Sequence, residues 1–186
     1  MESSNEYFQI VGGARLVGEV NVHGAKNSAL KLMAASLLAV GETTIENVPD
    51  IADVHIMEEL LTRLGCTCSY NRETLTMKIL VPKVPGHRAD YDLVRKMRAS
   101  INVLGPLVTR VGEVEVALPG GDAIGSRGID FHIKGLIDLG AEAHSEHGYV
   151  IATAPNGLTG AAISLDFPSV GATENIMTAA VLAKGV

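Results

Sequence analysis

The 186-residue sequence contains no tryptophan, only two cysteines and no continuous run of basic residues. Its 15 lysines and arginines are scattered among 21 acidic residues, which gives a formal net charge of -6. Proteins that bind nucleic acid by neutralising phosphates need a basic stripe. The composition therefore argues against a nucleic-acid partner, and scattered cations are typical of contacts with individual anionic groups on a small ligand.

Long apolar segments are also missing. The longest, residues 30–40, is interrupted by Lys31 and Ser36 and is far shorter than the roughly 20 residues that a membrane-spanning helix needs. Residues 1–6 are polar, with no apolar run behind them, so we do not expect a secretory signal. Cys66 and Cys68 lie too far apart along a strand for easy bridging, so we expect reduced thiols and a cytoplasmic location.

Apolar residues, by contrast, are abundant: they make up 47% of the chain, against 19% charged residues. This hydrophobic share is too high, and the net charge too low, for an intrinsically disordered protein. A chain of this length is expected to bury one core, and by length alone it is one domain.

The chain repeats itself with a period of about 72 residues. The segment 33–41 resembles the segment 177–185, which lies 144 positions later, and the related segment 103–112 lies between them. The segment 61–66 likewise matches 136–141 at an offset of 75. Self-similarity at a fixed period indicates a repeat architecture, here of two whole repeats and part of a third.

The first repeat reads as a βαβαββ unit. Alternating residues predict strands at 16–22, 43–48, 67–70 and 75–81. A buried helix is predicted over 27–39, and a second helix is predicted from one apolar stripe, which consists of Ile56, Met57, Leu60, Leu61 and Leu64. Asp50 and Asp53 are expected to cap this second helix.

The second repeat is predicted to contain a helix over 93–110, a strand over 113–118, a helix over 129–139 and a hairpin of 142–145 with 149–153. The apolar face of the 129–139 helix is predicted to consist of Ile129, Ile133, Leu136 and Ile137. The third repeat should contain a strand at 161–165 and a helix near 173–183. By comparison with the other two, it lacks about 40 residues beyond Gly185.

Three strand-to-helix loops carry residues suited to binding a ligand. The first brings Lys26 and Asn27 to a helix N-terminus, where free N–H groups and the helix dipole favour anions. The second, residues 118–127, is rich in glycine and carries Asp122 and Arg127, but it lacks the ending of a nucleotide P-loop. The third, residues 166–175, offers small polar residues. A solvated lysine at a helix cap and an aspartate-capped turn are the simpler alternatives for the first two loops.

The cations Lys26, Arg98 and Arg127 would together suit a phosphorylated small molecule, unless they are unrelated surface residues. His144 and His147 lie on either side of a turn and should diverge, so we expect no metal there. His132 is expected to have a hydrogen-bonded structural role.

Four motifs in order resemble one family. They are Gly24–Leu30 (GAKNSAL), Met97–Ser100 (MRAS), Leu118–His132 (LPGGDAIGSRGIDFH) and Ser169–Thr173 (SVGAT). Together they are similar to the UDP-N-acetylglucosamine 1-carboxyvinyltransferases, a family of enolpyruvyl transferases, from about Phe8 to the end of the chain. EPSP synthases, which are related, have serine where Asn27 stands here.

The resemblance implies an α/β fold, an inside-out α/β barrel built from βαβαββ repeats, of which the third is truncated here. Residues 1–22 would pair with a second domain, and residues 23–186 would form the first domain, incomplete at its C-terminus. It also implies transfer of enolpyruvate from phosphoenolpyruvate to the 3-hydroxyl of UDP-N-acetylglucosamine, in peptidoglycan precursor synthesis. No metal or organic cofactor is expected, and the missing half of the enzyme is the expected partner.

The resemblance also implies roles for individual residues. Lys26 and Asn27 would contact phosphoenolpyruvate, and Lys26, Asp122 and Arg127 would be catalytic. The positions implied to bind UDP-N-acetylglucosamine are Arg98, Arg127, Gly128, Ile129, Asp130, Phe131, Phe167, Pro168, Ser169, Val170 and Gly171.

One departure from the family concerns Asp122, because most members have cysteine there. That group is the acid that protonates the methylene carbon of phosphoenolpyruvate, and the antibiotic fosfomycin attaches to it. A minority of members have aspartate, so the departure is compatible with activity and favours insensitivity to fosfomycin.

Three readings stay open at this stage. The chain is either the inactive part of this enzyme or a non-catalytic half that binds a UDP-sugar or is completed by a partner chain. A relative that makes a different enolpyruvyl ether is the third reading, which Lys26 and Asn27 disfavour.

Overall fold

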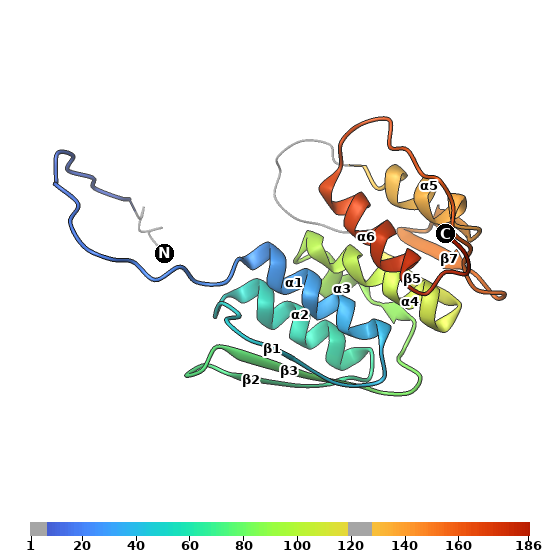
Figure 1. Cartoon of the computed structure of the whole chain (residues 1–186), viewed down its shortest axis with the longest axis horizontal. Coiled ribbons are helices and arrows are strands. Elements are labelled where there is room, and N and C mark those ends of the chain that lie inside the picture. The colour runs from blue at the N-terminus through green and yellow to red at the C-terminus, as the bar shows by residue number, and fades with distance from the viewer. Residues whose placement is uncertain (1–6, 119–127) are drawn as a thin grey trace, which may run out of the picture.

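The computed structural model describes residues 7–118 and 128–186, which form two sheets and a cluster of helices (Figure 1). The elements in chain order are α1 (Lys26–Ala35), η1 (Ser36–Leu38), β1 (Gly41–Ile45), α2 (Ala52–Arg63), β2 (Thr67–Asn71), β3 (Thr76–Val81), β4 (Arg88–Ala89), α3 (Tyr91–Val94), η2 (Arg98–Val103), α4 (Leu104–Val111), β5 (Glu113–Ala117), α5 (Asp130–Asp138), β6 (Glu142–Glu146), β7 (Tyr149–Thr153) and α6 (Val170–Ala180).

The first repeat folds around a three-stranded antiparallel sheet in the order β1-β3-β2. Met77, Ile79 and Val81 of β3 are buried in alternation with exposed residues, because successive side chains of a strand point to opposite faces. Helices α1 and α2 lie over one face of this sheet (Figure 1). The predicted stripe of α2 is confirmed, since its leucines and Met57 are buried.

The second repeat copies the first. Strands β5, β7 and β6 pair in the order of β1, β3 and β2, and β4, which the sequence did not predict, adds a short parallel edge strand. The predicted hairpin turns at His147 and Gly148, whose φ angles of 48° and 82° suit a tight two-residue turn. The first helices of the three repeats begin at Lys26, Arg98 and Val170, so the predicted period is confirmed.

Helix α6, which opens the third repeat, packs closely on the second repeat. A methyl group on Gly105 of α4 would collide with the carbonyl oxygen of Asn175, and one on Gly135 of α5 would collide with the side chain of Ile176. Glycine at these two positions is therefore what lets three helices approach one another.

Arg110, near the end of α4, ties the second repeat to the first. Its guanidinium donates hydrogen bonds to the carbonyl oxygens of Leu37, Ala39, Pro82 and Lys83. One side chain thus satisfies the end of η1 and the segment after β3, where carbonyl groups have no partner in a helix or sheet.

Two strand predictions are wrong. Residues 16–22 form no regular structure and leave the body of the molecule as an exposed arm (Figure 1). Residues 161–165 form no strand either, and the nearest pairing is a single parallel bridge between Thr159 and Lys184. Alternating residues become a strand only where another strand supplies partners for their N–H and C=O groups, and no described strand pairs with either segment.

The predicted helix over 93–110 is divided into α3, η2 and α4. Met97 is extended, with φ -147° and ψ 119°, so α3 ends and Arg98 begins a new turn. Pro106 lies in the first turn of α4, where a missing N–H costs little. The apolar pattern did not reveal this break, because η2 is buried nearly all round.

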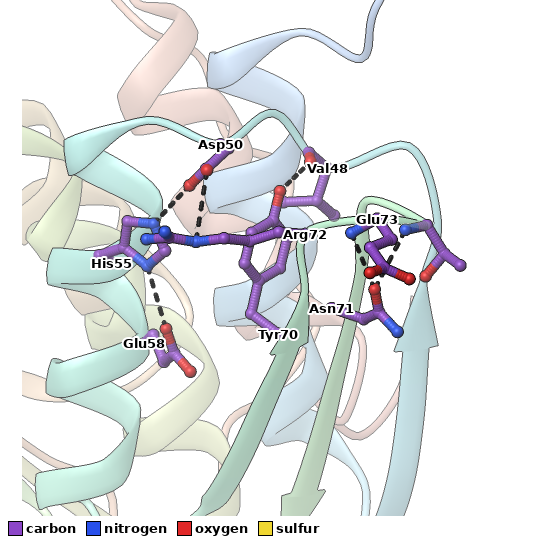
Figure 2. A network of polar contacts seen from close by, with 9 residues as sticks. Val48, Asp50, His55, Glu58, Tyr70, Asn71, Arg72 and Glu73 are labelled. Atoms are coloured by element: carbon purple, nitrogen blue, oxygen red, sulfur yellow. Dashed lines mark hydrogen bonds and ion pairs between the residues drawn. The ribbon is translucent and has the colours of Figure 1, made fainter.

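The prediction that Asp50 and Asp53 cap α2 is wrong. The capping position is Ile51, and it makes no side-chain cap. Asp50 instead lies 2.7 Å from Nε2 of His55 and pairs with Arg72 (Figure 2). Cationic partners have drawn both carboxylates away from the backbone N–H groups, since Asp53 pairs with Lys26.

The buried face of α5 is also partly mispredicted. Ile137 is 49% exposed, while His132 and Gly135 are buried. The reason is α6, which packs on Gly135 and hydrogen-bonds His132 through Asn175.

Within the described residues, no helix is both long enough and apolar enough to cross a membrane. Cys66 and Cys68 are free thiols, as predicted. Burial raises the pKa of Cys66 to about 12, so this thiol stays protonated near neutral pH.

Candidate functional site

A cavity of about 660 Å³ lies where the repeats meet. The starts of α1, η2, α5 and α6 all contribute to its wall, through Lys26, Arg98, Asp130 and Val170. Lys26, Arg98 and Val170 occupy equivalent positions of the three repeats, each at the start of a first helix. The N-terminal ends of helices, which carry free N–H groups and partial positive charge, therefore converge on one space.

Eleven residues that the sequence singled out line this cavity: Lys26, Asn27, Arg98, Gly128, Asp130, Phe131, Phe167, Pro168, Ser169, Val170 and Gly171. They come from four segments that are far apart in the chain. Ile129 is not on the wall, because it packs partly buried against the core. Asp122 and Arg127 lie outside the described residues. The arrangement gathers the predicted residues, while their individual roles in binding stay predictions.

The charges on the wall favour an anionic ligand. Lys26, Lys31, Lys96 and Arg98 line the cavity, whose carboxylates among the described residues are Asp53 and Asp130. A net positive cavity in a chain of net charge -6 concentrates the field where helix N-termini already attract anions.

Two of these lysines are held by carboxylates. Nζ of Lys26 lies 2.9 Å from Asp53 of α2, and Lys31 of α1 donates a hydrogen bond of 2.7 Å to Glu174 of α6. The first pair places a cation at the N-terminus of α1, and the second joins the first repeat to the third. An anion that reaches Lys26 meets a lysine already oriented by Asp53.

Local backbone features fix two of the loops. A methyl group on Gly24 would collide with the carbonyl of Asn47, so glycine lets the chain enter α1 close to the end of β1. At the start of α6, Oγ of Ser169 accepts a hydrogen bond of 3.3 Å from the N–H of Ala172, which is a standard helix cap.

His132 lines the cavity although its side chain is buried. Burial, followed by the nearby charge of Arg98, lowers the pKa of His132 to about 4. The imidazole is therefore neutral near pH 7. The prediction of a hydrogen-bonded role is confirmed, because Nδ1 of His132 lies 2.9 Å from Nδ2 of Asn175.

Sequence reasoning missed eight wall residues: Leu30, Lys31, Asp53, Lys96, Met97, Ala99, Ile101 and Asn102, and it gave His132 no place in the cavity. Helical spacing could have found some of them. Leu30 and Lys31 lie three and four residues after Asn27, which puts them on the same face of α1 as Asn27. Asp53 had no such signal, since its pairing with Lys26 depends on how α2 packs against α1.

No group of three or more histidine, cysteine, aspartate or glutamate side chains suited to a metal ion occurs in residues 7–118 and 128–186. Among the described groups, the chemistry that the cavity offers is the binding of anions by cations and backbone N–H groups.

Comparison with known proteins gives the family. The family model described as EPSP synthase (3-phosphoshikimate 1-carboxyvinyltransferase) matches residues 10–186. The UDP-N-acetylglucosamine 1-carboxyvinyltransferase of Mycobacterium leprae is 56% identical over 97% of this chain, and that of Corynebacterium efficiens is 53% identical over 100% of it. The chain spans 43% of the length of each of these relatives.

Solved structures agree on the fold. The enolpyruvyl transferase NikO from Streptomyces tendae is 25% identical, with a TM-score of 0.66 over 80% of this chain and 32% of its own. An EPSP synthase from Acinetobacter baumannii is 18% identical, with a TM-score of 0.69 over 90% of this chain and 39% of its own. The α/β architecture predicted from the repeats is thus that of enolpyruvyl transferases. Because the family model matches almost the whole of this chain, residues 10–186, the chain belongs to the EPSP synthase (3-phosphoshikimate 1-carboxyvinyltransferase) family.

Proposed function

We propose that this chain forms part of a UDP-N-acetylglucosamine 1-carboxyvinyltransferase and supplies one wall of its active site. The whole enzyme would transfer enolpyruvate from phosphoenolpyruvate to the 3-hydroxyl of UDP-N-acetylglucosamine. It would work in the cytoplasm, in the synthesis of peptidoglycan precursors for cell-wall growth and division.

One observation carries the proposal: residues from four distant motifs meet in one cationic cavity at the helix N-termini. Both proposed substrates are polyanions, one with a diphosphate and the other with a phosphate and a carboxylate. Four cations and converging N–H groups suit such ligands. The 56% identity to relatives that carry this name supports the same assignment.

Within this wall, we assign phosphoenolpyruvate to Lys26 and Asn27 at the start of α1. We assign the UDP-sugar to Arg98, Gly128, Asp130, Phe131 and residues 167–171 of the wall, and to Arg127 and Ile129 on the family resemblance alone. In the net reaction, a bond forms between the sugar 3-oxygen and C2 of the enolpyruvyl group, while the bond between C2 and the phosphate oxygen breaks. Asp122 would supply a proton to the methylene carbon during this exchange, and a proton is lost again when the double bond is restored.

The proposal includes a division of the chain. Residues 1–22 would belong with a second domain, and residues 23–186 would form the first. Residues 7–22 are exposed along their length, which is what a segment that pairs elsewhere requires. The remaining part of the same enzyme would be the partner that completes the site.

The test compares the 186-residue chain with a longer protein that continues its reading frame. We expect the longer protein to release phosphate and form the enolpyruvyl ether when both substrates are present, and the short chain to form no product. Arg98→Met in the longer protein should raise KM for the UDP-sugar at least tenfold, while Arg72→Met, at an exposed arginine that pairs with Asp50, should not. Turnover by the short chain, or none by the longer protein, would contradict the proposal.

A further inference from the structure

The side chain of Asn175 in α6 is buried, with 2% of the residue exposed, and it contacts residues of η2, α4 and α5 in the second repeat. Its Oδ1 accepts a hydrogen bond of 2.6 Å from the N–H of Gly105. Its Nδ2 donates one of 3.1 Å to the carbonyl of Ile101 and lies 2.9 Å from Nδ1 of His132. The oxygen and the nitrogen of this amide are thus directed at three fixed groups.

The two backbone contacts decide which way the amide faces. A backbone N–H only donates, so the atom opposite Gly105 must be the amide oxygen. A carbonyl only accepts, so the atom opposite Ile101 must be the amide nitrogen. The orientation of Asn175 therefore follows from its neighbours and needs no assumption about the histidine.

The amide in turn decides the tautomer of His132. Because the NH₂ group of Asn175 only donates, Nδ1 of His132 must accept and carries no proton. A neutral imidazole then bears its single proton on Nε2. This atom lies on the side of Gly171 at the cavity wall, and no hydrogen bond joins it to another residue in the described part of the chain.

We propose that Asn175 is a positioning residue that holds His132 as the neutral Nε2–H tautomer, so that the cavity presents one uncharged N–H donor among its cations. The donor would meet an acceptor oxygen of the bound UDP-sugar. The identity of that ligand rests on the proposed function, whereas the tautomer rests on the contacts of Asn175 alone.

An uncharged donor acts differently from the surrounding cations. Lysine and arginine attract any anion within reach and are screened by salt, whereas a fixed N–H selects for an acceptor at one place. The low pKa of His132 agrees with this role, since burial and Arg98 both disfavour the imidazolium. Asp130, on the same helix, acts in the opposite direction and does not prevail.

The test is nitrogen-15 NMR of the histidine rings in the 186-residue chain near pH 7, where one-bond and two-bond couplings identify the protonated nitrogen. We expect the His132 ring to show Nε2–H and a bare Nδ1. An Nδ1–H ring or an imidazolium would overturn the proposal. This measurement needs no variant, so it decides the question even if every substitution at Asn175 unfolds the chain.

Asn175→Asp tests the cause. A carboxylate still accepts from Gly105 but has no proton for Nδ1, so we expect the His132 proton to move to Nδ1 or the ring to become charged. Asn102→Asp is the matched control, because Asn102 lies on the same cavity wall and makes no hydrogen bond to His132. It should leave the Nε2–H tautomer in place. An unchanged tautomer in folded Asn175→Asp would refute positioning by Asn175.

Titration with UDP-N-acetylglucosamine separates the two proposals. We expect the Nε2 resonance of His132 to shift on binding, and Asn175→Asp to weaken the affinity about tenfold. Binding without any change at Nε2 would overturn the assigned contact. No binding of this ligand to the longer protein would count against the proposed function. The tautomer of His132 would still be decided by the nitrogen-15 spectrum.

Discussion

A carboxylic acid that donates a proton near neutral pH must have a pKa above its ordinary value of about 3.9. Asp122, which lies outside the described residues, must meet this demand if it replaces the usual cysteine. Burial beneath bound substrates and their phosphate charges would raise its pKa, while Arg127 would lower it.

In the longer protein, we expect Asp122→Asn to abolish formation of the enolpyruvyl ether, because an amide cannot donate that proton. Asp122→Cys should keep activity and gain covalent labelling by fosfomycin, since a thiolate attacks an epoxide better than a carboxylate does. Product assays and mass spectrometry measure both. Labelling of the unchanged protein, or full activity of Asp122→Asn, would contradict this role.

Asp53 pairs with Lys26 and so partly neutralises a cation of the cavity. Asp53→Asn should bind inorganic phosphate about two- to fivefold more tightly, because exposed ion pairs are worth up to roughly 1 kcal/mol. Calorimetric titration at low salt measures this. Glu42→Gln removes a carboxylate that pairs with Lys78 far from the cavity, and it should leave the affinity unchanged. Weaker phosphate binding by Asp53→Asn would mean that the carboxylate matters more for placing Lys26 than for shielding it.

Individual site residues could be predicted from the sequence where a local loop motif contains them. Lys26 with Asn27, and Ser169 with Gly171, stand in motifs that predict a helix N-terminus, and they do line one cavity. His132 was predicted only as a structural residue. Its place at the cavity is fixed by Asn175, which lies 43 positions away in the sequence. Contacts of this kind depend on packing between repeats, which no local pattern contains.

Among the elements, the helix pair α4 and α6 depends on the absence of a side chain at Gly105. Gly105→Ala should lower the free energy of unfolding by about 1–3 kcal/mol, even though alanine favours helices, because the methyl group meets backbone and side-chain oxygens of α6. Urea denaturation measures the change. Gly12→Ala on the exposed arm, with no atom within 4 Å, is the control and should have little effect. A neutral Gly105→Ala would show that α4 and α6 do not approach this closely.

A histidine at the start of α2 should make the stability of the folded chain depend on pH. Its His55 lies between Asp50 and Glu58 (Figure 2), and the hydrogen bond to Asp50 is the main reason that the pKa of His55 is raised. A raised pKa in the folded state adds stability that is complete below the unfolded value of about 6.5 and is lost as pH rises through the folded value. His55 is 35% exposed as a side chain, so the effect should stay below about 1 kcal/mol.

We therefore expect His55→Gln to be less stable than the unchanged chain near pH 6 and to approach it above about pH 8. Denaturation curves at several pH values measure the difference. His147→Gln, at an exposed turn, is the control and should change the pH dependence less. A gap that widens with rising pH would have the wrong sign and would rule out this account.

Helices and strands could be predicted where the residues that stabilise them are close in the sequence. The hairpin at His147 and Gly148 was found because both strands and the turn are local, and the stripe of α2 was found because one face is uniformly apolar. Residues 16–22 have the right alternation but no described partner. The break at Met97 was not predicted because buried residues recur before it, at Leu93 and Val94, and after it, from Ser100 onward, as they would along one helix. Pro106 already indicated a helix that begins nearby.

For the molecule as a whole, Arg110 joins the first two repeats through four carbonyl groups. Arg110→Met keeps most of the apolar stem but leaves four acceptors without their donor, two of them in partly buried contacts. We therefore expect the free energy of unfolding to fall by about 2–4 kcal/mol. Thermal or urea unfolding measures it. Arg15→Met is the control for loss of charge alone and should stay within about 0.5 kcal/mol. A similarly small change for Arg110→Met would mean that water replaces the guanidinium at little cost.

The contacts between repeats also bear on how the chain folds. Arg110 reaches carbonyls 71 and 73 residues away, Asn175 reaches groups 70 and 74 residues away, and Lys31 meets Glu174 at a separation of 143, so these contacts span one or two repeat lengths. Hairpins such as β6–β7 close locally and form within microseconds, whereas non-local contacts slow folding. Closure entropy grows only with the logarithm of loop length, so spanning two repeats instead of one adds just about 0.6 kcal/mol. The rate-limiting event should therefore be the meeting of the helix starts around the cavity, which makes the ligand site the last part of the chain to take shape.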